Sequence, residues 1–219
     1  NTSINSNYTF GSYGLQKHLV QADLGDQKNK AKLTYSNLHS DGYRENNKTD
    51  RQTITLASKH FINASNKLTL VGSYIDLKAF IPSSINEDNY LNNPTSSAFT
   101  WERSKGFEDY KKGLFGISWE HLYTNNTKQK TSVFTSFLNA YEPRPFNILR
   151  ETAKGIGLRT RVISKVKLFD KSLNWTFGGE LFKDSNSYQT FENLYNDFPP
   201  EEGSVQGDLL SNFKEKRSY

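Results

Sequence analysis

The sequence has no cysteine, no methionine and no long run of apolar residues. Without cysteine, a disulfide framework, a thiolate zinc site and a cysteine nucleophile are excluded. No stretch approaches the roughly 18–20 apolar residues that a membrane helix needs, so we expect no helical span. No signal peptide is visible, and the chain does not begin with Met, which favours a processed or excised segment.

Hydrophobic residues make up only 34% of the chain, whereas aromatic residues reach 14%, with 15 Phe and 12 Tyr. Globular domains usually contain about 45–50% apolar residues, and disordered chains lack aromatic rings. Many rings in a chain of low hydropathy indicate thin apolar surfaces rather than one thick core. A transmembrane β-barrel has such a composition, because half of each strand faces a polar lumen.

The chemistry-bearing residues form no catalytic or metal-binding pattern. His18, His39, His60 and His121 are dispersed, without a pair at ligand spacing. No nucleophile elbow is present, and Gly155-Ile156-Gly157 lacks the third glycine of a phosphate-binding loop. The net charge of +5 is scattered along the chain, which disfavours nucleic-acid binding. We therefore expect no enzyme, no cofactor and no metal bound by protein ligands.

A two-residue period, interrupted by turns of alternating length, organises the chain. It predicts eight strands, near 14–24, 31–40, 50–61, 67–77, 113–123, 129–141, 155–168 and 172–183. Short connections are expected at 25–30, 63–66, 124–128 and 169–171. Long connections are expected at 40–49, 78–112, 142–154 and from 184 onward. Short periplasmic turns alternating with long extracellular loops are typical of an outer-membrane barrel.

Each of the last two predicted strands has one apolar and one polar face, because side chains alternate across a strand. The residues expected to face lipid are Ile156, Leu158, Val162, Val166, Leu173, Trp175, Phe177 and Leu181. Those expected to face the lumen are Arg159, Arg161, Lys165, Lys167 and Glu180, with Glu180 partly compensating the basic row. The strand at 129–141 is ambiguous, because Val133, Phe134 and Phe137 do not share a face. Phe61, Tyr74, Tyr123 and Tyr141 are candidates for an interfacial girdle.

A soluble antiparallel sheet with one wet face would show the same alternation. Strand length favours the membrane, since membrane strands need about 9–11 residues and soluble strands average about 5–6. Several of the predicted strands run to ten residues or more. The prediction is thus an all-β, antiparallel transmembrane β-barrel segment of about eight strands.

Several segments, in order along the chain, carry a family resemblance. They are Gly11-Ser12-Tyr13-Gly14, Ser40-Asp41-Gly42-Tyr43-Arg44-Glu45-Asn46, Ile81-Pro82-Ser83-Ser84, Asn93-Pro94, Trp101, Ser104-Lys105-Gly106-Phe107-Glu108-Asp109-Tyr110, Glu142-Pro143-Arg144-Pro145-Phe146-Asn147-Ile148-Leu149 and Gly178-Gly179-Glu180. Together they resemble the barrel of TonB-dependent receptors of the bacterial outer membrane, particularly ferric-citrate receptors. The resemblance implies a plugged barrel of about 22 strands. It also implies active uptake of an iron–siderophore or iron–citrate-type complex, energised by the TonB–ExbB–ExbD complex.

The sequence shows neither the plug nor the N-terminal box through which such receptors are energised. An arc of eight strands would leave two unpaired edges, which lipid does not tolerate. We therefore expect residues 1–219 to be part of a receptor barrel domain, embedded in lipopolysaccharide and outer-membrane lipid, with the plug and remaining strands elsewhere. A complete eight-stranded barrel is disfavoured, because the charged segment 212–219 lacks the alternation of a closing strand.

The predicted loops offer binding chemistry for a small metal chelate. The candidate ligand-binding residues are Tyr43, Arg44, Trp101, Arg103, Glu142, Arg144 and Arg150. Arginine presents a rigid donor fork that suits carboxylates and other oxyanions. The same residues could instead only cap strands and tie loops together. Two rival functions stay open at this point, namely a passive porin and a surface-exposed β-rich adhesion module, and solubility without detergent would support the latter.

Overall fold

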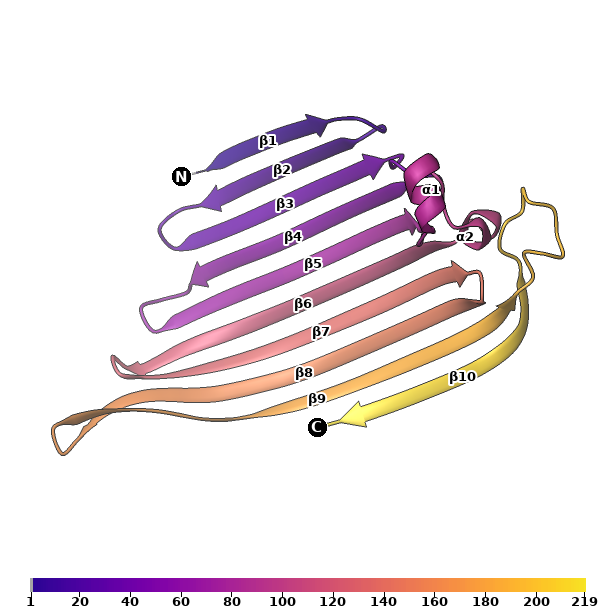
Figure 1. Ribbon diagram of the computed structural model, residues 1–219. Coiled ribbons are helices and arrows are strands. Elements are labelled where there is room, and N and C mark those ends of the chain that lie inside the picture. The colour runs from indigo at the N-terminus through magenta and orange to yellow at the C-terminus, as the bar shows by residue number, and fades with distance from the viewer. Residues whose placement is uncertain (1) are drawn as a thin grey trace.

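The computed structural model describes residues 2–219 as one antiparallel sheet of ten strands, each paired with the next along the chain (Figure 1). The strands are β1 (Ser3–Phe10), β2 (Gln16–Gly25), β3 (Asn29–Ser40), β4 (Thr49–Phe61), β5 (Asn66–Phe80), β6 (Phe107–Thr124), β7 (Thr127–Arg144), β8 (Asn147–Leu168), β9 (Lys171–Asn193) and β10 (Gln206–Ser218). Two short helices, α1 (Glu87–Asn92) and α2 (Phe99–Arg103), lie between β5 and β6. The predicted all-β antiparallel fold is confirmed.

The eight predicted strands correspond to β2–β9, and the sequence prediction missed β1 and β10. The charged segment 212–219, which does not predict a strand, lies almost entirely in β10. It pairs with the upper half of β9, where Asn212 faces Gln189 and Arg217 faces Asp184. One face of this pair is polar, with Lys214 and Lys216 opposite Ser187 and Ser185, whereas the other carries Phe213 opposite Tyr188, so the apolar alternation of a lipid-facing strand is absent here.

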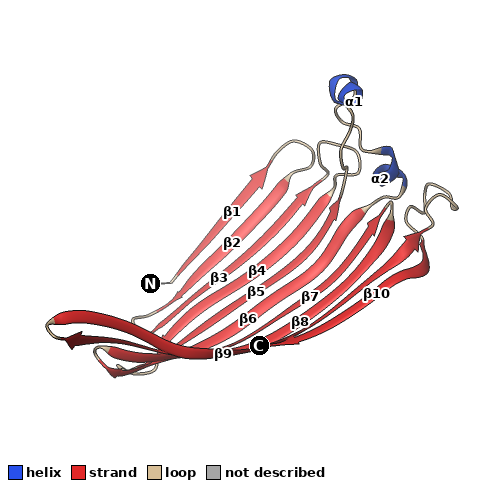
Figure 2. Ribbon diagram, turned by 60° about the horizontal axis from the view of Figure 1, so that its bottom comes forward, coloured by secondary structure: helices blue, strands red, loops and turns tan. Residues whose placement is uncertain are grey.

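Tight turns gather at one edge of the sheet and longer connections at the other (Figure 2). The tight turns lie at 26–28, 62–65, 125–126 and 169–170. In the first, Asp26 Oδ1 accepts the backbone N–H groups of Lys28 and Asn29, both at 2.7 Å. These two bonds lower the pKa of Asp26. In the last, Phe169 and Asp170 have φ of 50° and 59°, the left-handed conformation that two-residue hairpins require.

The opposite edge corrects three predicted loops. The connection expected at 142–154 is a two-residue turn, Pro145-Phe146, because β7 and β8 continue beyond the apolar part of the sheet. The segment from 184 is likewise the upper half of β9. The connection expected at 78–112 is shorter, at 81–106, and it is not structureless, since it contains α1 and α2.

The strand register assigns a face to every paired residue. One row of directly paired residues crosses five strands and is aliphatic throughout, namely Leu70, Ile117, Val133, Leu158 and Leu181. We call this side the apolar face and its central part the apolar band. The band comprises Ile4, Val20, Ala22, Leu24, Leu33, Tyr35, Ile54, Leu56, Leu68, Leu70, Tyr74, Phe115, Ile117, Trp119, Val133, Phe137, Ile156, Leu158, Val162, Val166, Leu173, Trp175, Phe177 and Leu181.

The opposite side, the polar face, carries ion pairs and a few rings. Arg159 Nε lies 2.6 Å from Glu180 Oε2, as the predicted compensation of the basic row requires. Phe134 also points to this face and stacks on Phe182 at 6.0 Å, whereas Val133 and Phe137 belong to the apolar face. The ambiguity of the strand at 129–141 is thereby resolved, since its rings divide between two surfaces.

The predicted aromatic girdle requires one correction. Phe61 pairs with Lys67 on the polar face, where Lys67 Nζ reaches Glu120 Oε1 at 2.6 Å. Tyr74 and Tyr123 do lie on the apolar face, Tyr74 in the middle of β5 and Tyr123 near the end of β6. Tyr123 donates a hydrogen bond to Gln129 Oε1 at 2.6 Å. Phe61 was misplaced because its position at a strand end does not reveal its face.

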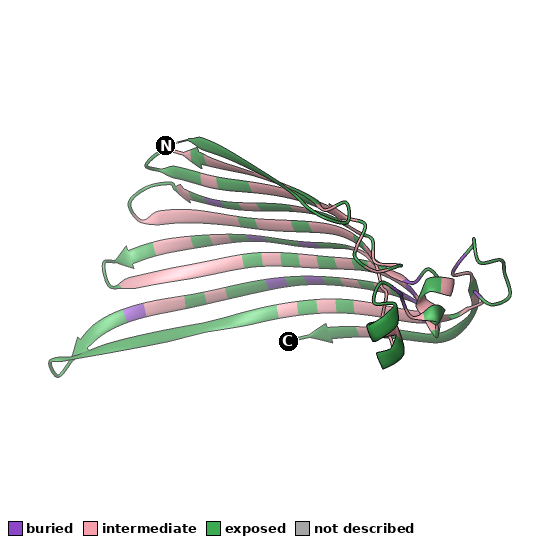
Figure 3. Cartoon of the chain, turned by 45° about the horizontal axis from the view of Figure 1, so that its top comes forward, coloured by how far each residue is buried: buried purple, intermediate pink, exposed green. Residues whose placement is uncertain are grey.

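Burial is concentrated where the long connections meet. Among residues 2–219 the buried hydrophobic side chains are Ile148, Leu149 and Tyr195, at 0%, 7% and 8% exposure. Most strand residues are half-buried or exposed on both faces of the single layer (Figure 3). Within residues 2–219 no helix is long and apolar enough to cross a membrane.

Candidate ligand-binding rim

The long-connection edge forms a rim that includes most of the predicted ligand-binding residues. We define the rim as the loops 41–48, 81–106 and 194–205 together with the β7–β8 turn at 144–147. Figure 2 shows α1 and α2 standing at this edge. Helix α1 is capped by Asn86, whose side chain accepts the N–H of Asn89 at 2.8 Å.

Arg44 and Asn46 fasten loop 41–48 to loop 81–106. The Arg44 guanidinium donates to three carbonyls, at 2.8 Å to Ser96 O, 2.6 Å to Ser83 O and 3.4 Å to Pro82 O. The Asn46 amide donates to the carbonyls of Ile81 and Gly106, both at 2.9 Å, and of Trp101 at 3.3 Å. These donors satisfy carbonyls that no strand pairs. Arg44 therefore acts as a tie within the protein.

A second set of contacts fastens loop 81–106 to loop 194–205. Arg103 Nη2 donates to Phe198 O at 2.7 Å, and Lys105 Nζ donates to Glu201 O at 2.5 Å. Ser204 Oγ donates to the carbonyl of the fully buried Ser104 at 2.6 Å. Among residues 2–219 Arg103 Nη1 is buried without a hydrogen-bond partner. The guanidinium is thus directed into the rim, with Nη2 bonded to loop 194–205.

Asn193 joins the β7–β8 turn to the same loops. Its Nδ2 donates to Arg144 O at 2.9 Å and to Ser204 Oγ at 2.8 Å, and its Oδ1 accepts the Val205 N–H at 3.2 Å. Every polar atom of this amide is used. The rim is consequently one continuous hydrogen-bonded structure from loop 41–48 to loop 194–205.

Glu142 and Arg144 lie together on the polar face at the β7–β8 turn, above the apolar band. Arg144 donates from Nε and Nη2 to Asn147 Oδ1, at 2.9 and 2.6 Å. Its Nη1 lies 3.7 Å from Glu142 Oε2. Burial raises the pKa of Glu142. The positive charge of Arg144 opposes this rise, and the negative charge of Glu108 adds to it. Arg144 is left as a partly compensated positive charge at the turn.

An aromatic group adjoins Arg144. Its guanidinium lies 5.0 Å from the ring centre of Phe146, which is 67% exposed. Trp101 contacts the same ring edge to face, with centroids 6.5 Å apart. Trp101, Arg144 and Phe146 therefore form a mixed cationic and aromatic group, of which Phe146 is exposed while Trp101 and Arg144 are half-buried.

The remaining candidates lie apart from this surface. Tyr43 is 46% exposed and contacts Tyr13 edge to face at 5.3 Å, towards the β1 side of the rim. Arg150 is on the apolar-face side of β8, over the ring of Tyr141 at 4.8 Å, with Nε donating to Gln206 Oε1 at 2.9 Å. Of the seven candidates the structure brings together Trp101, Glu142 and Arg144.

Sequence reasoning missed the residues that organise the rim. Asn46, Asn193 and Ser204 hold it together, yet each is an ordinary loop or strand-end residue by type. The acceptor of Asn46 at Gly106 lies 60 positions along the chain. No pattern of residue types encodes a partner that is a distant backbone carbonyl. Phe146 lies within the segment 142–149 that carries the family resemblance. Its exposure in the structure identifies it as a surface residue of the rim.

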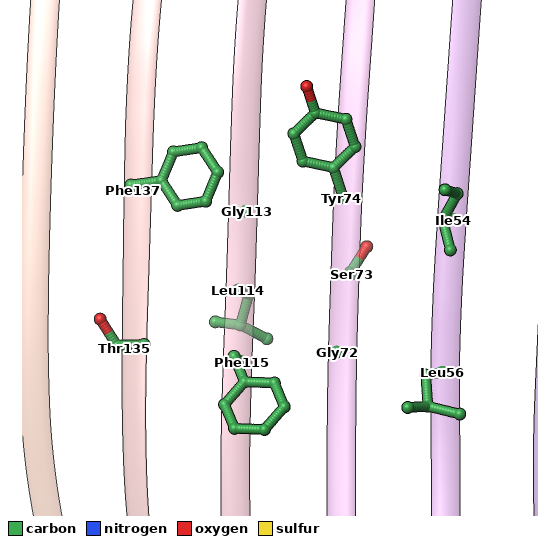
Figure 4. A pocket seen from close by; sticks show the side chains of 10 residues that line it. All are labelled: Ile54, Leu56, Gly72, Ser73, Tyr74, Gly113, Leu114, Phe115, Thr135 and Phe137. Carbon is green, nitrogen blue, oxygen red and sulfur yellow. The ribbon is translucent and has the colours of Figure 1, made fainter.

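The hollow shown in Figure 4 lies in the apolar band and away from the rim. It measures about 310 Å³ and opens where Gly72 and Gly113 leave the sheet without side chains, between the rings of Tyr74, Phe115 and Phe137. An open apolar hollow of this kind suits hydrocarbon better than a hydrated chelate. Among residues 2–219 no cluster of three or more His, Asp or Glu side chains could hold a metal ion.

No family model and no curated protein matches the sequence, whereas solved structures match the fold. The ferripyoverdine receptor of the Pseudomonas aeruginosa outer membrane matches over 98% of this chain at 9% identity and a TM-score of 0.78. The ferric-catecholate import receptor Fiu of Escherichia coli K12 matches over 100% at 12% identity and 0.75. The ferric citrate transporter FecA matches over 98% at 12% identity and 0.75. The chain has the fold of a TonB-dependent receptor barrel.

The receptor-barrel fold also covers a copper transporter, OprC, at a TM-score of 0.60. The chain spans about a third of these proteins, namely 33% of the ferripyoverdine receptor, 37% of Fiu and 33% of FecA. The proteins with this fold are named as receptors and transporters.

We predict that Arg44→Ala loosens loop 81–106 in this receptor-barrel fold. Three carbonyls would lose a charged donor, and such hydrogen bonds contribute about 1.5–3 kcal/mol, so the loop should open roughly 10- to 150-fold more often. Hydrogen exchange and limited proteolysis within 81–106 measure this. Exchange in Arg44→Lys should be faster than in the wild type and slower than in Arg44→Ala, since an ammonium cannot span the three acceptors. Unchanged exchange in Arg44→Ala would contradict the assignment of Arg44 as a tie.

Proposed function

We propose that this chain forms wall and extracellular rim of a bacterial outer-membrane receptor for active uptake of a scarce metal chelate. The observation that carries the proposal is the apolar band, a face that crosses nine strands without a charged side chain and ends in charges at the long-loop side. A soluble sheet would have to cover that face. In the proposed receptor it contacts lipid.

The two faces then take the roles expected from the sequence. Ile156, Leu158, Val162, Val166, Leu173, Trp175, Phe177 and Leu181 all belong to the apolar band and would face lipid. Arg159, Arg161, Lys165, Lys167 and Glu180 all belong to the polar face and would face the lumen. The pairing of Arg159 with Glu180 supports this orientation, because both charges avoid the side that would contact hydrocarbon.

The rim supports an anionic chelate as the ligand. Arg144 supplies a fixed positive charge, while Trp101 and Phe146 supply aromatic surface beside it. A ferric siderophore or ferric citrate presents oxyanions together with a bulky organic shell, and such a surface fits both. Iron is the leading metal, although the similarity to a copper transporter shows that the fold alone does not select it.

The open strand edges support a larger assembly. Over the described residues β1 and β10 each pair on one side only, and lipid does not tolerate such edges. Residues 1–219 would therefore be one arc of a closed barrel whose other strands and plug complete it. Energy would reach the plug from the TonB–ExbB–ExbD complex, as the resemblance implies.

Uptake of radiolabelled ferric citrate and of a panel of ferric siderophores by cells that express the full receptor tests the proposal. Arg144→Ala should weaken binding of an anionic chelate by about tenfold or more, since a charged hydrogen bond contributes about 1.5–3 kcal/mol. Arg150→Ala is the matched control. It removes the same charge from the other face, three residue pairs further from the β7–β8 turn, and binding should change less than about twofold.

Two results would decide against active uptake by a membrane receptor. Transport that continues after the proton-motive force is collapsed would identify a passive porin. A refolded monomer that stays soluble without detergent would identify an adhesion or binding module, and the apolar band would then need another explanation.

A further inference from the structure

The polar face carries its basic residues unevenly, with an excess near the short turns that Figure 2 shows at one edge of the sheet. The strand register sorts this face into rows, each of which crosses the strands at one height. In the rows nearest the short turns nine basic residues stand against two acidic ones. They are Lys30, Lys59, Lys67, Lys128, Lys130, Arg159, Arg161, Lys165 and Lys167, against Glu120 and Glu180.

The two carboxylates engage only three of these cations. Glu120 lies 2.6 Å from Lys67 Nζ and 3.4 Å from Lys128 Nζ, and Glu180 lies 2.6 Å from Arg159 Nε. Among residues 2–219 the other six side chains have no ion-pair or hydrogen-bond partner. All of them except Lys130 are exposed. We call these six the basic belt, namely Lys30, Lys59, Lys130, Arg161, Lys165 and Lys167.

The same face is electrically balanced in the rows between the belt and the rim. The three rows through Val71, Ser73 and Ile75 contain as many acidic as basic residues. The potential on this face therefore becomes more positive towards the short turns, and a wall of one sign attracts counter-ions. The charged residues of the three balanced rows are Lys32, Lys112, Arg217, Asp23, Asp184 and Glu215.

Two open hollows lie beside cations of the belt. One of about 220 Å³ lies among Lys30, Lys59 and Thr69. The other, of about 350 Å³, lies beside Arg161, where the carboxylate of Glu180 is already paired. Each hollow offers charged donors to an oxyanion, and such hydrogen bonds are stronger than those between neutral groups.

Hydroxyl groups connect the two hollows along one row. Thr69, Ser118 and Ser132 lie between Lys59 on β4 and Arg159 on β8. Ser132 donates a hydrogen bond to Ser118 Oγ at 2.9 Å. A hydroxyl can donate to an anion or accept from a cation. The row therefore continues the hydrophilic surface from one hollow to the other without a negative charge between them.

We propose that the basic belt is a second anion site, which an anionic chelate occupies after it leaves Arg144 at the rim and before its release at the short-turn side. The inference rests on the proposed function, in which the polar face is the lumen wall. Rings of Lys and Arg attract anions in pores, and passage requires sites weak enough to release the solute. Exposed cations that are spread over β3, β4, β7 and β8 provide several such weak contacts.

An acidic surface of the plug is the other occupant that the belt would attract. The hollows favour the small anion, because they are separate, one on β3–β4 and the other on β8–β9. A docked protein surface would instead keep the cations paired at all times. The two occupants differ in the measured consequence, since only the solute makes the belt matter for the rate of uptake alone.

Uptake of radiolabelled ferric citrate, or of the anionic siderophore complex that the panel identifies, by cells expressing the full receptor tests the proposal. In the triple variant Lys59→Ser, Lys130→Ser, Arg161→Ser the maximal rate should fall about tenfold, the low end of what charged clefts contribute to encounter rates. Equilibrium binding to de-energised cells should change less than about twofold, because Arg144 is untouched. The charge-conserving variant Lys59→Arg, Lys130→Arg, Arg161→Lys should keep the wild-type rate.

The matched control is Lys17→Ser, Arg51→Ser, Lys112→Ser. It also removes two lysines and one arginine from the polar face, but nearer to the rim. Its maximal rate should change less than about twofold. Equal rates in the wild type and the belt variant would overturn the proposal, as would an equal fall in the control. Faster hydrogen exchange of the plug in the belt variant would overturn it in favour of an acidic plug surface.

Two further outcomes are separable. If the triple serine variant does not fold, the single variants Lys59→Ser and Arg161→Ser replace it, each with an expected fall of about twofold, and unchanged rates in both would contradict the site. A wild-type receptor that takes up no anionic chelate would refute the proposed function itself. The belt, in contrast, is refuted only by the behaviour of variants of a receptor that does transport such a chelate.

Discussion

Phe177→Arg should destabilise the membrane-embedded receptor by about 2–4 kcal/mol, which is roughly a 30- to 900-fold change in its folding equilibrium. Phe177 lies at the centre of the apolar band on β9, pairs with Val162 and is 77% exposed. If this face contacts hydrocarbon, a guanidinium there must be dehydrated or must distort the bilayer. Denaturant unfolding of the full receptor in lipid vesicles measures the free energy of unfolding.

The neighbouring substitution Thr176→Arg is the control. Thr176 points to the polar face and pairs with Ile163, so its arginine can stay hydrated in the lumen. A surface change of this kind usually costs less than about 0.5 kcal/mol. The two variants differ by one position along one strand, and only the face distinguishes them. An equal cost for both, or a greater cost for Thr176→Arg, would reverse the assignment of lipid and lumen.

The strands that cross the apolar band were predictable because lipid imposes alternation on them. In β8 and β9 the alternation is clear between Ile156 and Val166 and between Leu173 and Leu181. The structure places the residues predicted to face lipid in these two segments on one face. Above the band that constraint ends. Arg150 and Lys154 on one face and Glu151 on the other are polar alike. The apolar and polar alternation therefore ends there, and the sequence predicts a loop at 142–154 where the structure has strand.

The rim could not be predicted for a different reason. Its ties run from side chains to backbone carbonyls that are distant in sequence, as from Arg44 to Ser96 or from Ser204 to Ser104. A carbonyl has no residue-type signature. Sequence could show that Arg44 is a strong donor in a loop. It could not show whether a ligand or the protein itself would take up the donor, and the structure shows that three carbonyls do.

A second large effect is expected at Ile148, because the stability of the rim depends on a small core. Ile148 is fully buried between Pro143 on β7 and Phe191 on β9. At 0% exposure the side chain is covered by protein and meets neither solvent nor lipid. Ile148→Ala would remove three carbon atoms from a closed site, at a cost of about 2–5 kcal/mol.

Ile156→Ala, eight positions along β8, is the control for Ile148→Ala. Ile148 is covered by protein, whereas Ile156 would be covered by lipid. Ile156 is 57% exposed on the apolar face, so its truncation in detergent leaves no cavity and should cost less than about 1 kcal/mol. Hydrogen exchange in loops 81–106 and 194–205 should rise in Ile148→Ala and stay unchanged in Ile156→Ala, since only the former supports the rim. If Ile148→Ala left both the free energy of unfolding and rim exchange at wild-type values, the rim would not depend on this core. The position of Trp101, Arg144 and Phe146 would then have to be fixed by the hydrogen-bonded ties alone.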